Sequence, residues 1–542
     1  MRTPLGRLTM PTTGLLVAVL ALGAVAAPGY ADGTDPDPAD TSTATGTTTG
    51  TTGDAADAAV DALDDVEELL EPASSDEGSD ERSTESVVPE RTTDDGRDLT
   101  LAMRDLRLRQ NDLPRSERAR AAALLNRPPG SEGWAAEVWR DYGTVRVHWD
   151  NGTVNPDYID QVGAVATHVL GTYQAAGYRA PEPDGTKGGD AKLDVYISDL
   201  GDGLYGYCNT DHAPPAKGPY DTPAYCSFSS DYSWAGGQTP LDNLKVTAAH
   251  ELFHATQFAY DYEEDAWFLE ATATWAEDEV YDNINDNRQY LSESPMRQPR
   301  KPLDQFLNCY SCAPRQYGEW IFFRYLTERF PQSQGGLPVI MRRLMQRIDA
   351  SRGGPDNYSI QAVARELASR KTDLRHVYAQ FGDANRRPAR TYEEGSAYRA
   401  AGAAKTWALT PRKHNSGVQK VLVDHLSTAT VQAKPSRSLH GKRLRIDLNL
   451  PAPTTGAGAV VTRYDRKGRT KSTFVRLSKA GNARVTVPFD GRSTIRVDVT
   501  LSNAGIAYHC WTAQRDDPVL YSCSGRSKDN NAPMSYRLST VG

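Results

Sequence analysis

The feature that most constrains this chain is a pair of histidines four residues apart, His250 and His254, which enclose Glu251 in the run His-Glu-Leu-Phe-His. The run lies in a predicted helix, because Thr239 supplies a capping residue and no Gly or Pro occurs from Leu241 to Trp267. Helical residues four apart share one face, so both imidazoles can bind a single metal ion. Glu251 then lies beside the metal, where its carboxylate can take a proton from a zinc-bound water. The run therefore predicts a catalytic zinc site.

The next helical run, Trp267 to Glu277, offers the third protein ligand that such a site needs. Only an acidic turn separates it from the first helix, and two helices with so short a connection tend to pack side by side. This packing can bring Glu270 onto the metal and leave the fourth position open for water. Glu277, on nearly the same face, is an alternative ligand, or it could orient a ligand imidazole through a hydrogen bond. We expect Glu270 to be the ligand.

The two helices together resemble the gluzincin branch of the zincin metallopeptidases, whose second zinc helix carries a Trp-x-x-Glu-(Gly/Ala)-x-Ala pattern. Here Ala271 stands where many members have Gly, and the interval before Glu270 is shorter than in thermolysin-like or aminopeptidase N-like enzymes. The block from about 145 to 330 is also similar to a family of secreted bacterial metalloproteases that combine HExxH with a Leu-Glu-Ala-Thr-Ala second helix. The resemblance implies an α+β zincin-like catalytic domain, with a small N-terminal sheet, the HExxH helix and a mostly helical C-terminal lobe.

Hydrolysis also needs a group that stabilises the oxyanion formed when water attacks a carbonyl. In gluzincins a Tyr or His beyond the second zinc helix often has this role. The run from Arg315 to Leu326 resembles the tyrosine-bearing helix of aminopeptidase-like members, although its Gly is displaced. Tyr317 is therefore the candidate for the oxyanion, and the alternative is that it only packs beside Trp320.

The N-terminus predicts export. Residues 1–31 contain Arg2 and Arg7, then an apolar stretch that is too short to span a membrane and ends in small residues, as in a secretory signal peptide. Residues 32–98 hold 21 acidic and 3 basic side chains, which indicates a disordered acidic arm that could be a propeptide or a spacer. The rest of the chain is mildly basic without a dense basic stripe, so we expect no nucleic-acid partner.

The remaining sequence divides into three parts. Residues 99–130 read as a helical pro-region or linker that Pro128-Pro129-Gly130 ends. Residues 131–404 would form the catalytic domain, with a β-α-β lead-in in which 224–229 could be the edge strand that binds substrate. Residues 405–542 read as an all-β sandwich, an accessory domain for which no ligand pattern is evident. The expected sandwich strands are 418–423, 443–450, 459–463, 473–477, 483–487 and 494–500.

Six cysteines in an exported chain favour disulfides. Proximity in the sequence suggests three pairs: Cys208 with Cys226, Cys309 with Cys312, and Cys510 with Cys523. The middle pair could instead be a redox Cys-x-x-Cys, but no thioredoxin-like strand precedes it.

These patterns together predict a secreted, extracellular zinc metallopeptidase that hydrolyses peptide bonds by attack of a zinc-bound water activated by Glu251. We expect one catalytic Zn²⁺, a protein or peptide substrate, no membrane span and a monomer. The acidic turn Asp261–Asp265 could hold calcium, but it lacks EF-hand spacing and is better interpreted as a hydrated loop. Two alternative functions stay open: a non-catalytic exported binding protein on a zincin frame, and an amidase acting on cell-wall peptides.

Overall fold

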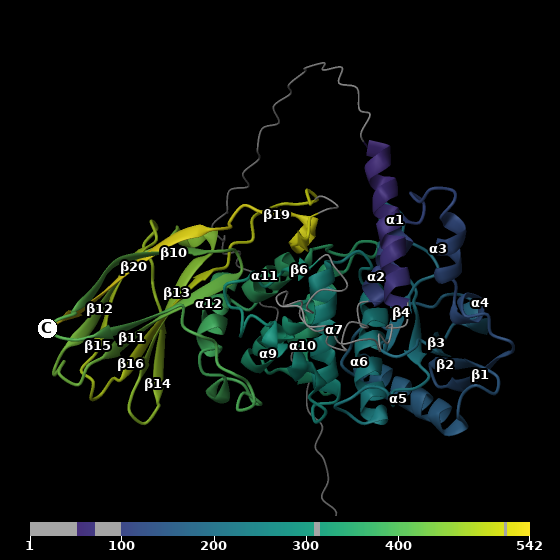
Figure 1. Cartoon of the computed structure of the whole chain (residues 1–542), viewed down its shortest axis with the longest axis horizontal. Helices are drawn as coiled ribbons and strands as arrows, with labels where there is room; N and C mark the ends of the chain where they lie inside the picture. The colour runs from purple at the N-terminus through teal and green to yellow at the C-terminus, as the bar shows by residue number, and fades with distance from the viewer. Residues whose placement is uncertain (1–50, 71–98, 308–314, 514–516) are drawn as a thin grey trace, which may run out of the picture. The chain divides into compact units, whose positions relative to one another are not determined.

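The computed structural model describes residues 51–70, 99–307, 315–513 and 517–542 (Figure 1). The predicted signal peptide, the remainder of the acidic arm, and the proposed pair Cys309 and Cys312 lie outside the described residues. The other two disulfides are present as predicted, Cys208–Cys226 and Cys510–Cys523. Among the described helices, none combines the length and the apolar composition that a bilayer span requires.

A five-stranded sheet opens the main body, in the order β1-β2-β3-β5-β4. Strands β2, β3 and β5 are parallel, and the two edge strands β1 and β4 run antiparallel to their neighbours. Helix α5 (Pro156–Ala175) connects β2 to β3 and packs on the sheet, as the β-α-β lead-in predicted. The strand bounds are β1 Glu137–Tyr142, β2 Val145–Asp150, β3 Leu193–Ser198, β4 Gly206–Asn209 and β5 Tyr225–Ser229.

The predicted edge strand was wrong. Residues 225–229 of this stretch form β5, which lies between β3 and β4 and has every residue buried. The free edge belongs to β4, which returns antiparallel along β5 with Cys208 opposite Cys226. Strand β4 has only four residues, too few to show an alternating pattern in the sequence. The sequence therefore predicted the longer β5 as the edge strand.

The two predicted zinc helices are α6 (Pro240–Phe258) and α7 (Ala266–Val280), which pack against each other. The side chain of Thr239 accepts a hydrogen bond from the Asp242 amide at 3.1 Å and so caps α6, as its sequence predicted. Further helices follow, as expected for this part of the chain. They are α8 Arg315–Gly318, α9 Trp320–Arg329, α10 Val339–Ile348, α11 Ser359–Ser369 and α12 Leu374–Ala384, with the short strands β6 Phe306–Leu307, β7 Ser333–Gln334 and β8 Leu337–Pro338 among them.

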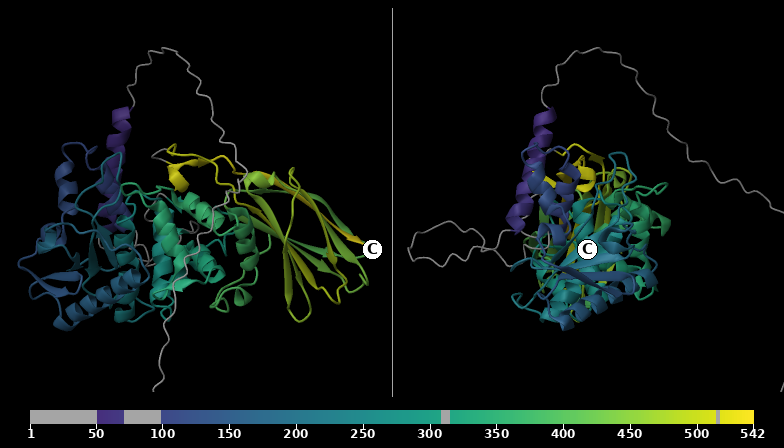
Figure 2. Two further views of the ribbon diagram at one scale, coloured as in Figure 1. Left: turned by 180° about the vertical axis from the view of Figure 1, so that it is seen from behind. Right: turned by 90° about the vertical axis from the view of Figure 1, so that its right-hand side faces the viewer.

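The acidic arm is not disordered throughout, because its residues Thr51–Leu70 form helix α1. Ala59, Leu63 and Val66 recur at helical spacing and are buried, so α1 has an apolar stripe that packs on α2 (Leu99–Arg109). In Figures 1 and 2, α1 (purple) runs alongside the main body next to α2. The predicted helical stretch 99–130 is broken into α2, α3 (Arg118–Leu124) and α4 (Pro128–Ser131).

The C-terminal part is β-rich, as predicted, and its two sheets share one hydrophobic core. One sheet has the order β10-β20-β12-β15 and the other β14-β13-β16-β11-β9. Strands β9, β11 and β20 were not predicted from the sequence. The bounds are β9 Lys405–Leu409, β10 Asn415–Val423, β11 Ser427–Pro435, β12 Arg443–Asn449, β13 Ala457–Tyr464, β14 Thr470–Phe474, β15 Asn482–Pro488, β16 Arg496–Asn503 and β20 Ala532–Val541.

This region is less separate than its sequence suggested. Between β16 and β20 the chain leaves the two sheets and returns to the helical part, where β18 pairs with β6. Ser522 and Cys523 donate backbone hydrogen bonds to the carboxylates of the buried Asp304 and the half-buried Asp265, at 3.1 and 2.9 Å. The strands of this excursion are β17 Tyr508–His509, β18 Val519–Leu520 and β19 Arg526–Ser527.

Candidate metal centre

Helices α6 and α7 bring His250, His254 and Glu270 together in the interior. The two Nε2 atoms are 3.0 Å apart, His250 Nε2 lies 3.1 Å from Glu270 Oε2, and His254 Nε2 lies 3.5 Å from Glu270 Oε1. All three side chains are at most 1% exposed. The three residues predicted as metal ligands therefore converge on one point.

The opposite ring nitrogens have partners of their own. His250 Nδ1 lies 2.7 Å from Glu277 Oε1, and His254 Nδ1 lies 2.7 Å from Gln257 Oε1. Since both partners are acceptors, each Nδ1 carries the proton, and each Nε2 lone pair faces the other ligands. Glu277 thus orients His250 rather than reaching the cluster centre, the second of the two positions that its sequence left open.

Gln257 was not anticipated from the sequence. Its amide nitrogen donates to Leu269 O at 3.0 Å and to Thr272 Oγ1 at 2.8 Å, both on α7. These bonds fix the direction of the Gln257 side chain and with it the ring of His254. The position three residues after His254 on one helix face is the signal that could have identified it.

The geometry of this cluster fits a zinc ion. A tetrahedral site with bonds of roughly 2.0–2.1 Å has ligand atoms about 3.3 Å apart, close to the separations found here. Glu270 Oε1 is buried and has no hydrogen-bond partner among the described residues, so it is available as a metal ligand. Two imidazoles and a carboxylate are a donor set typical of catalytic zinc.

The charges of the cluster favour a cation. Burial opposes the charged form of His250, but Glu270 and Glu277 outweigh this and raise the pKa of His250 to about 10. Burial likewise opposes ionisation of Glu270, yet the facing His254 and His250 lower the pKa of Glu270 to about 2. The buried carboxylates therefore hold positive charge in this cluster, and a divalent cation can take the place of the proton.

Glu251 lies on α6 beside the ligands and has its own hydrogen bond. Its Oε2 accepts from the Thr100 hydroxyl at 2.8 Å, and the side chain is 1% exposed. Burial raises the pKa of Glu251, while His250 and His254 partly offset this effect. A raised pKa is typical of a carboxylate that accepts and then releases a proton in catalysis. No local sequence signal pointed to Thr100.

Tyr317, on α8, lies close to the ligands: its ring centroid is 5.8 Å from that of His250. Tyr290 stacks on its other side with a centroid distance of 4.9 Å. The structure thus brings Tyr317 to the cluster from the element where the sequence placed it.

The acidic turn between α6 and α7 uses its carboxylates on the protein itself. Asp261 Oδ1 accepts from the Glu263 amide at 2.9 Å, and Glu264 Oε1 accepts from the amides of Asp265 and Ser359 at 2.6 and 3.0 Å. These bonds shape the turn that sets α7 against α6.

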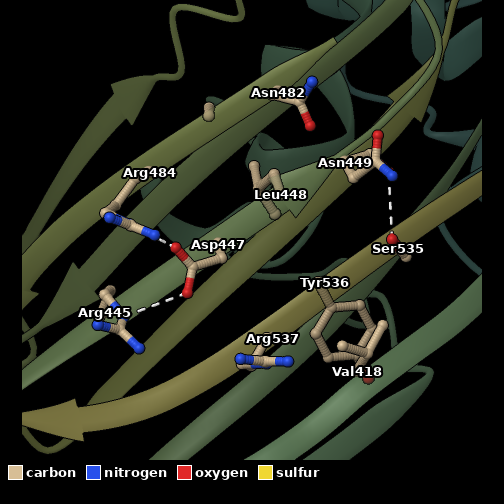
Figure 3. A pocket seen from close by; sticks show the side chains of 11 residues that line it. Val418, Arg445, Asp447, Leu448, Asn449, Asn482, Arg484, Ser535, Tyr536 and Arg537 are labelled. Carbon is tan, nitrogen blue, oxygen red and sulfur yellow. Dashed lines mark hydrogen bonds and ion pairs between the residues drawn. The ribbon is translucent and has the colours of Figure 1, made fainter.

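The C-terminal sheet β10-β20-β12-β15 carries a hollow of a different kind (Figure 3). Its floor is polar, and Asp447 accepts from Arg484 Nε at 2.6 Å and faces Arg445 Nε at 3.2 Å. Because Asp447 already pairs with Arg484 and Arg445, its carboxylate is less available to a ligand than that of Glu270 between α6 and α7.

Comparisons with known proteins identify no relative for this chain. No family model matches it, and no curated protein matches it. Among solved structures, the pre-peptidase C-terminal domain of a collagenase from Bacillus anthracis aligns with 10% identity, covering 25% of this chain and 94% of that one, with a TM-score of 0.15. A family GH115 4-O-methyl-alpha-glucuronidase aligns with 7% identity, covering 56% of this chain and 38% of that one, with a TM-score of 0.14. Likenesses this low assign neither fold nor function, so a functional assignment depends on the cluster's own chemistry.

Proposed function

We propose that this chain is a secreted zinc-dependent metallopeptidase of the gluzincin type, which hydrolyses peptide bonds in proteins or peptides. One observation carries the proposal: the Nε2 atoms of His250 and His254 and the carboxylate of Glu270 converge, while Glu277 and Gln257 hold the Nδ1 protons. Structural ion pairs rarely need two imidazoles facing each other with matched supports. A metal ligand set does.

The fold and the disulfides add support. A small sheet with an antiparallel edge strand precedes the HExxH helix, and a second helix supplies the carboxylate, as in a zincin-like domain. Two disulfides favour an oxidising, extracellular compartment.

His250, His254 and Glu270 would hold the ion, which when bound supplies Lewis acidity that acidifies water and polarises a carbonyl. Glu251 would take the proton of the attacking water and then deliver it to the leaving amine. Its burial and raised pKa suit both halves of this transfer. Tyr317 would donate a hydrogen bond to the oxyanion from the side of His250.

The test combines metal analysis with Glu251→Gln and Glu270→Gln, in the full chain and after limited trypsin treatment. We expect one zinc per chain, and cleavage of a casein-type substrate that a chelator abolishes. Glu251→Gln should keep the zinc and lose about 10²–10⁴-fold in rate. Glu270→Gln should lose zinc. The exposed Glu263, in the turn between the helices, gives the matched control Glu263→Gln, which should change neither property.

The outcomes separate the alternatives. A chain that binds no zinc contradicts the proposal. Cleavage of purified cell-wall fragments but not of peptides would favour an amidase. Zinc binding without hydrolysis of either substrate, in treated and untreated protein, would favour a binding protein.

A further inference from the structure

Helix α2 covers the cluster between α6 and α7. Thr100, fully buried near the start of α2, donates its hydroxyl proton to Glu251 Oε2 at 2.8 Å. The same hydroxyl oxygen accepts from the Cys208 amide at 2.9 Å. The Thr100 hydroxyl therefore hydrogen-bonds both to the carboxylate proposed as the general base and to a backbone amide of β4.

That backbone donor lies on the free edge of the sheet. In the antiparallel pair β4 and β5, Cys208 stands opposite Cys226, yet its amide is directed to Thr100 and not to β5. Outward amides on an edge strand are the groups that an extended peptide would pair with. Thr100 thus occupies a position that a substrate backbone and the attacking water would need.

Burial confirms that the cluster is closed in this arrangement. His250 and Glu251 are each 1% exposed, and His254 and Glu270 are 0% exposed. A peptide substrate cannot reach any of these side chains while α2 stays where it is. A hydrolase that acts on polymers needs an open path to its metal.

The described contacts that attach α2 are noncovalent. Leu99, Leu101 and Leu106 bury their side chains, and Arg104 Nη1 donates to Glu264 O at 2.8 Å. On its other side α2 packs on α1, and α1 is held to α3 by pairing of Glu67 with Arg120. No disulfide among those described joins α1 or α2 to the rest.

A loop that is exposed except at the buried Leu113 follows α2. Asn111, Asp112, Pro114, Arg115 and Ser116 are exposed between α2 and α3. A cut after Arg115 would separate the helical hairpin, defined here as α1 and α2, from the sheet and the two metal helices.

We infer that the helical hairpin is an autoinhibitory segment, in which Thr100 blocks the general base and the substrate-binding edge strand until the loop 111–116 is cut and the hairpin leaves. The inference rests on the proposed function, whose site it regulates. It concerns how the site is closed, so it can fail while the metallopeptidase assignment stands.

The first experiment uses the zinc-loaded full chain before and after limited trypsin cleavage, with mass spectrometry to verify the cut after Arg115. The readouts are binding of a fluorescent hydroxamate, which needs an accessible zinc ion, and hydrolysis of a quenched-fluorescent peptide. We expect the intact chain to bind the hydroxamate at least tenfold more weakly than the cut chain freed of its hairpin in mild urea. Peptide hydrolysis should increase in parallel.

The second experiment does not depend on zinc or activity. After the cut, the fragment that contains α1 and α2 is followed by size-exclusion chromatography as it leaves the body. Thr100→Val, which keeps the shape and removes the hydroxyl, should speed this release at least threefold. Arg109→Gln, at an exposed position on the same helix, is the matched control and should not.

Equal hydroxamate binding by intact and cut chains would overturn the inference, as would release from Thr100→Val at the wild-type rate. Failure of the metallopeptidase proposal has a different signature, because neither form would then bind zinc or the hydroxamate. Fragment release remains measurable in that case, so the two failures are distinguishable.

Discussion

Two helix pairs meet at the hydrogen bond between Thr100 and Glu251, and they are built differently. In α6 and α7 nearly every side chain is buried, and the polar ones are fixed by partners such as Gln257 and Glu277. In the other pair the inner helix α2 is largely buried, whereas α1 buries only its apolar stripe and exposes the acidic residues Asp57, Asp61 and Asp64. From this difference we expect α6 and α7 to stay rigid, and α1 and α2 to be able to dissociate from the rest of the protein.

The largest expected effect comes from removing one buried leucine in each pair. Leu252 on α6 and Leu63 on α1 are both fully buried, and Leu→Ala in such positions costs about 2–5 kcal/mol. We expect Leu252→Ala to lower the free energy of global unfolding by this amount in urea titrations. Leu63→Ala should instead speed amide hydrogen exchange in α1 and α2 while global unfolding changes little.

The expected difference between the two helix pairs is wrong if Leu63→Ala lowers the free energy of global unfolding as much as Leu252→Ala does. The hairpin would then be an integral layer of the fold, and not a segment that opens by itself.

A smaller effect is expected at Glu277. Glu277→Gln replaces the charged partner of His250 Nδ1 with a neutral one, and loss of such support typically weakens metal binding 10–100-fold. The zinc dissociation constant, measured by competition with a chromophoric chelator, checks this. Glu279→Gln on the same helix, which contacts Trp275 rather than a ligand histidine, should bind zinc as the wild type does. Similar constants for the two variants would show that Glu277 does not support the ligand.

The smallest effect concerns the pH dependence of the hairpin. Burial, together with Asp105, Glu68 and Asp64, raises the pKa of Asp65 on α1 to about 6 from 3.8. A carboxyl with a raised pKa in the folded state favours the packing of α1 on α2 when it is protonated, and this contribution is lost as pH rises from about 4 to 6. Because Asp65 is partly exposed, the loss should be below about 1 kcal/mol.

In Asp65→Asn, α1 should therefore pack on α2 more firmly than in the wild type at pH 8 and equally at pH 4. Amide exchange of α1 at the two pH values, corrected for the intrinsic rate, measures this difference. An Asn variant that docks more weakly at pH 8 would contradict the assigned sign.

The sequence allowed the group His250, His254 and Glu270 to be predicted because these residues lie close together in the chain. His250, Glu251 and His254 need only one helix, and Glu270 needs one further helix after a short turn. The β-α-β lead-in and the mostly helical lobe after it were predicted as well, and α5, α10 and α11 lie in these parts. Glu277 was placed on the correct face, but its choice between ligand and support depended on the distance between two helices.

The errors occurred where tertiary contacts decide. Residues 51–70 are acidic enough to look disordered, and only packing on α2 stabilises their narrow apolar stripe as α1. The edge strand β4 is defined by its pairing with β5 and has no pattern of its own. The contact of Thr100 with Glu251 joins positions 151 residues apart, a separation that no motif spans.

The excursion between β16 and β20 has a consequence for how this protein can be dissected. Asp265 immediately precedes α7, and its carboxylate accepts a hydrogen bond from the Cys523 amide. The Tyr508 hydroxyl and the Ser522 amide donate hydrogen bonds to the buried carboxylate of Asp304. A version cut short at residue 404 would leave the buried Asp304 carboxylate without these donors and would leave Asp265 with the Ser359 hydroxyl, at a cost of several kcal/mol. The β-rich C-terminal part therefore stabilises the start of α7, and truncated versions of the protein should retain it.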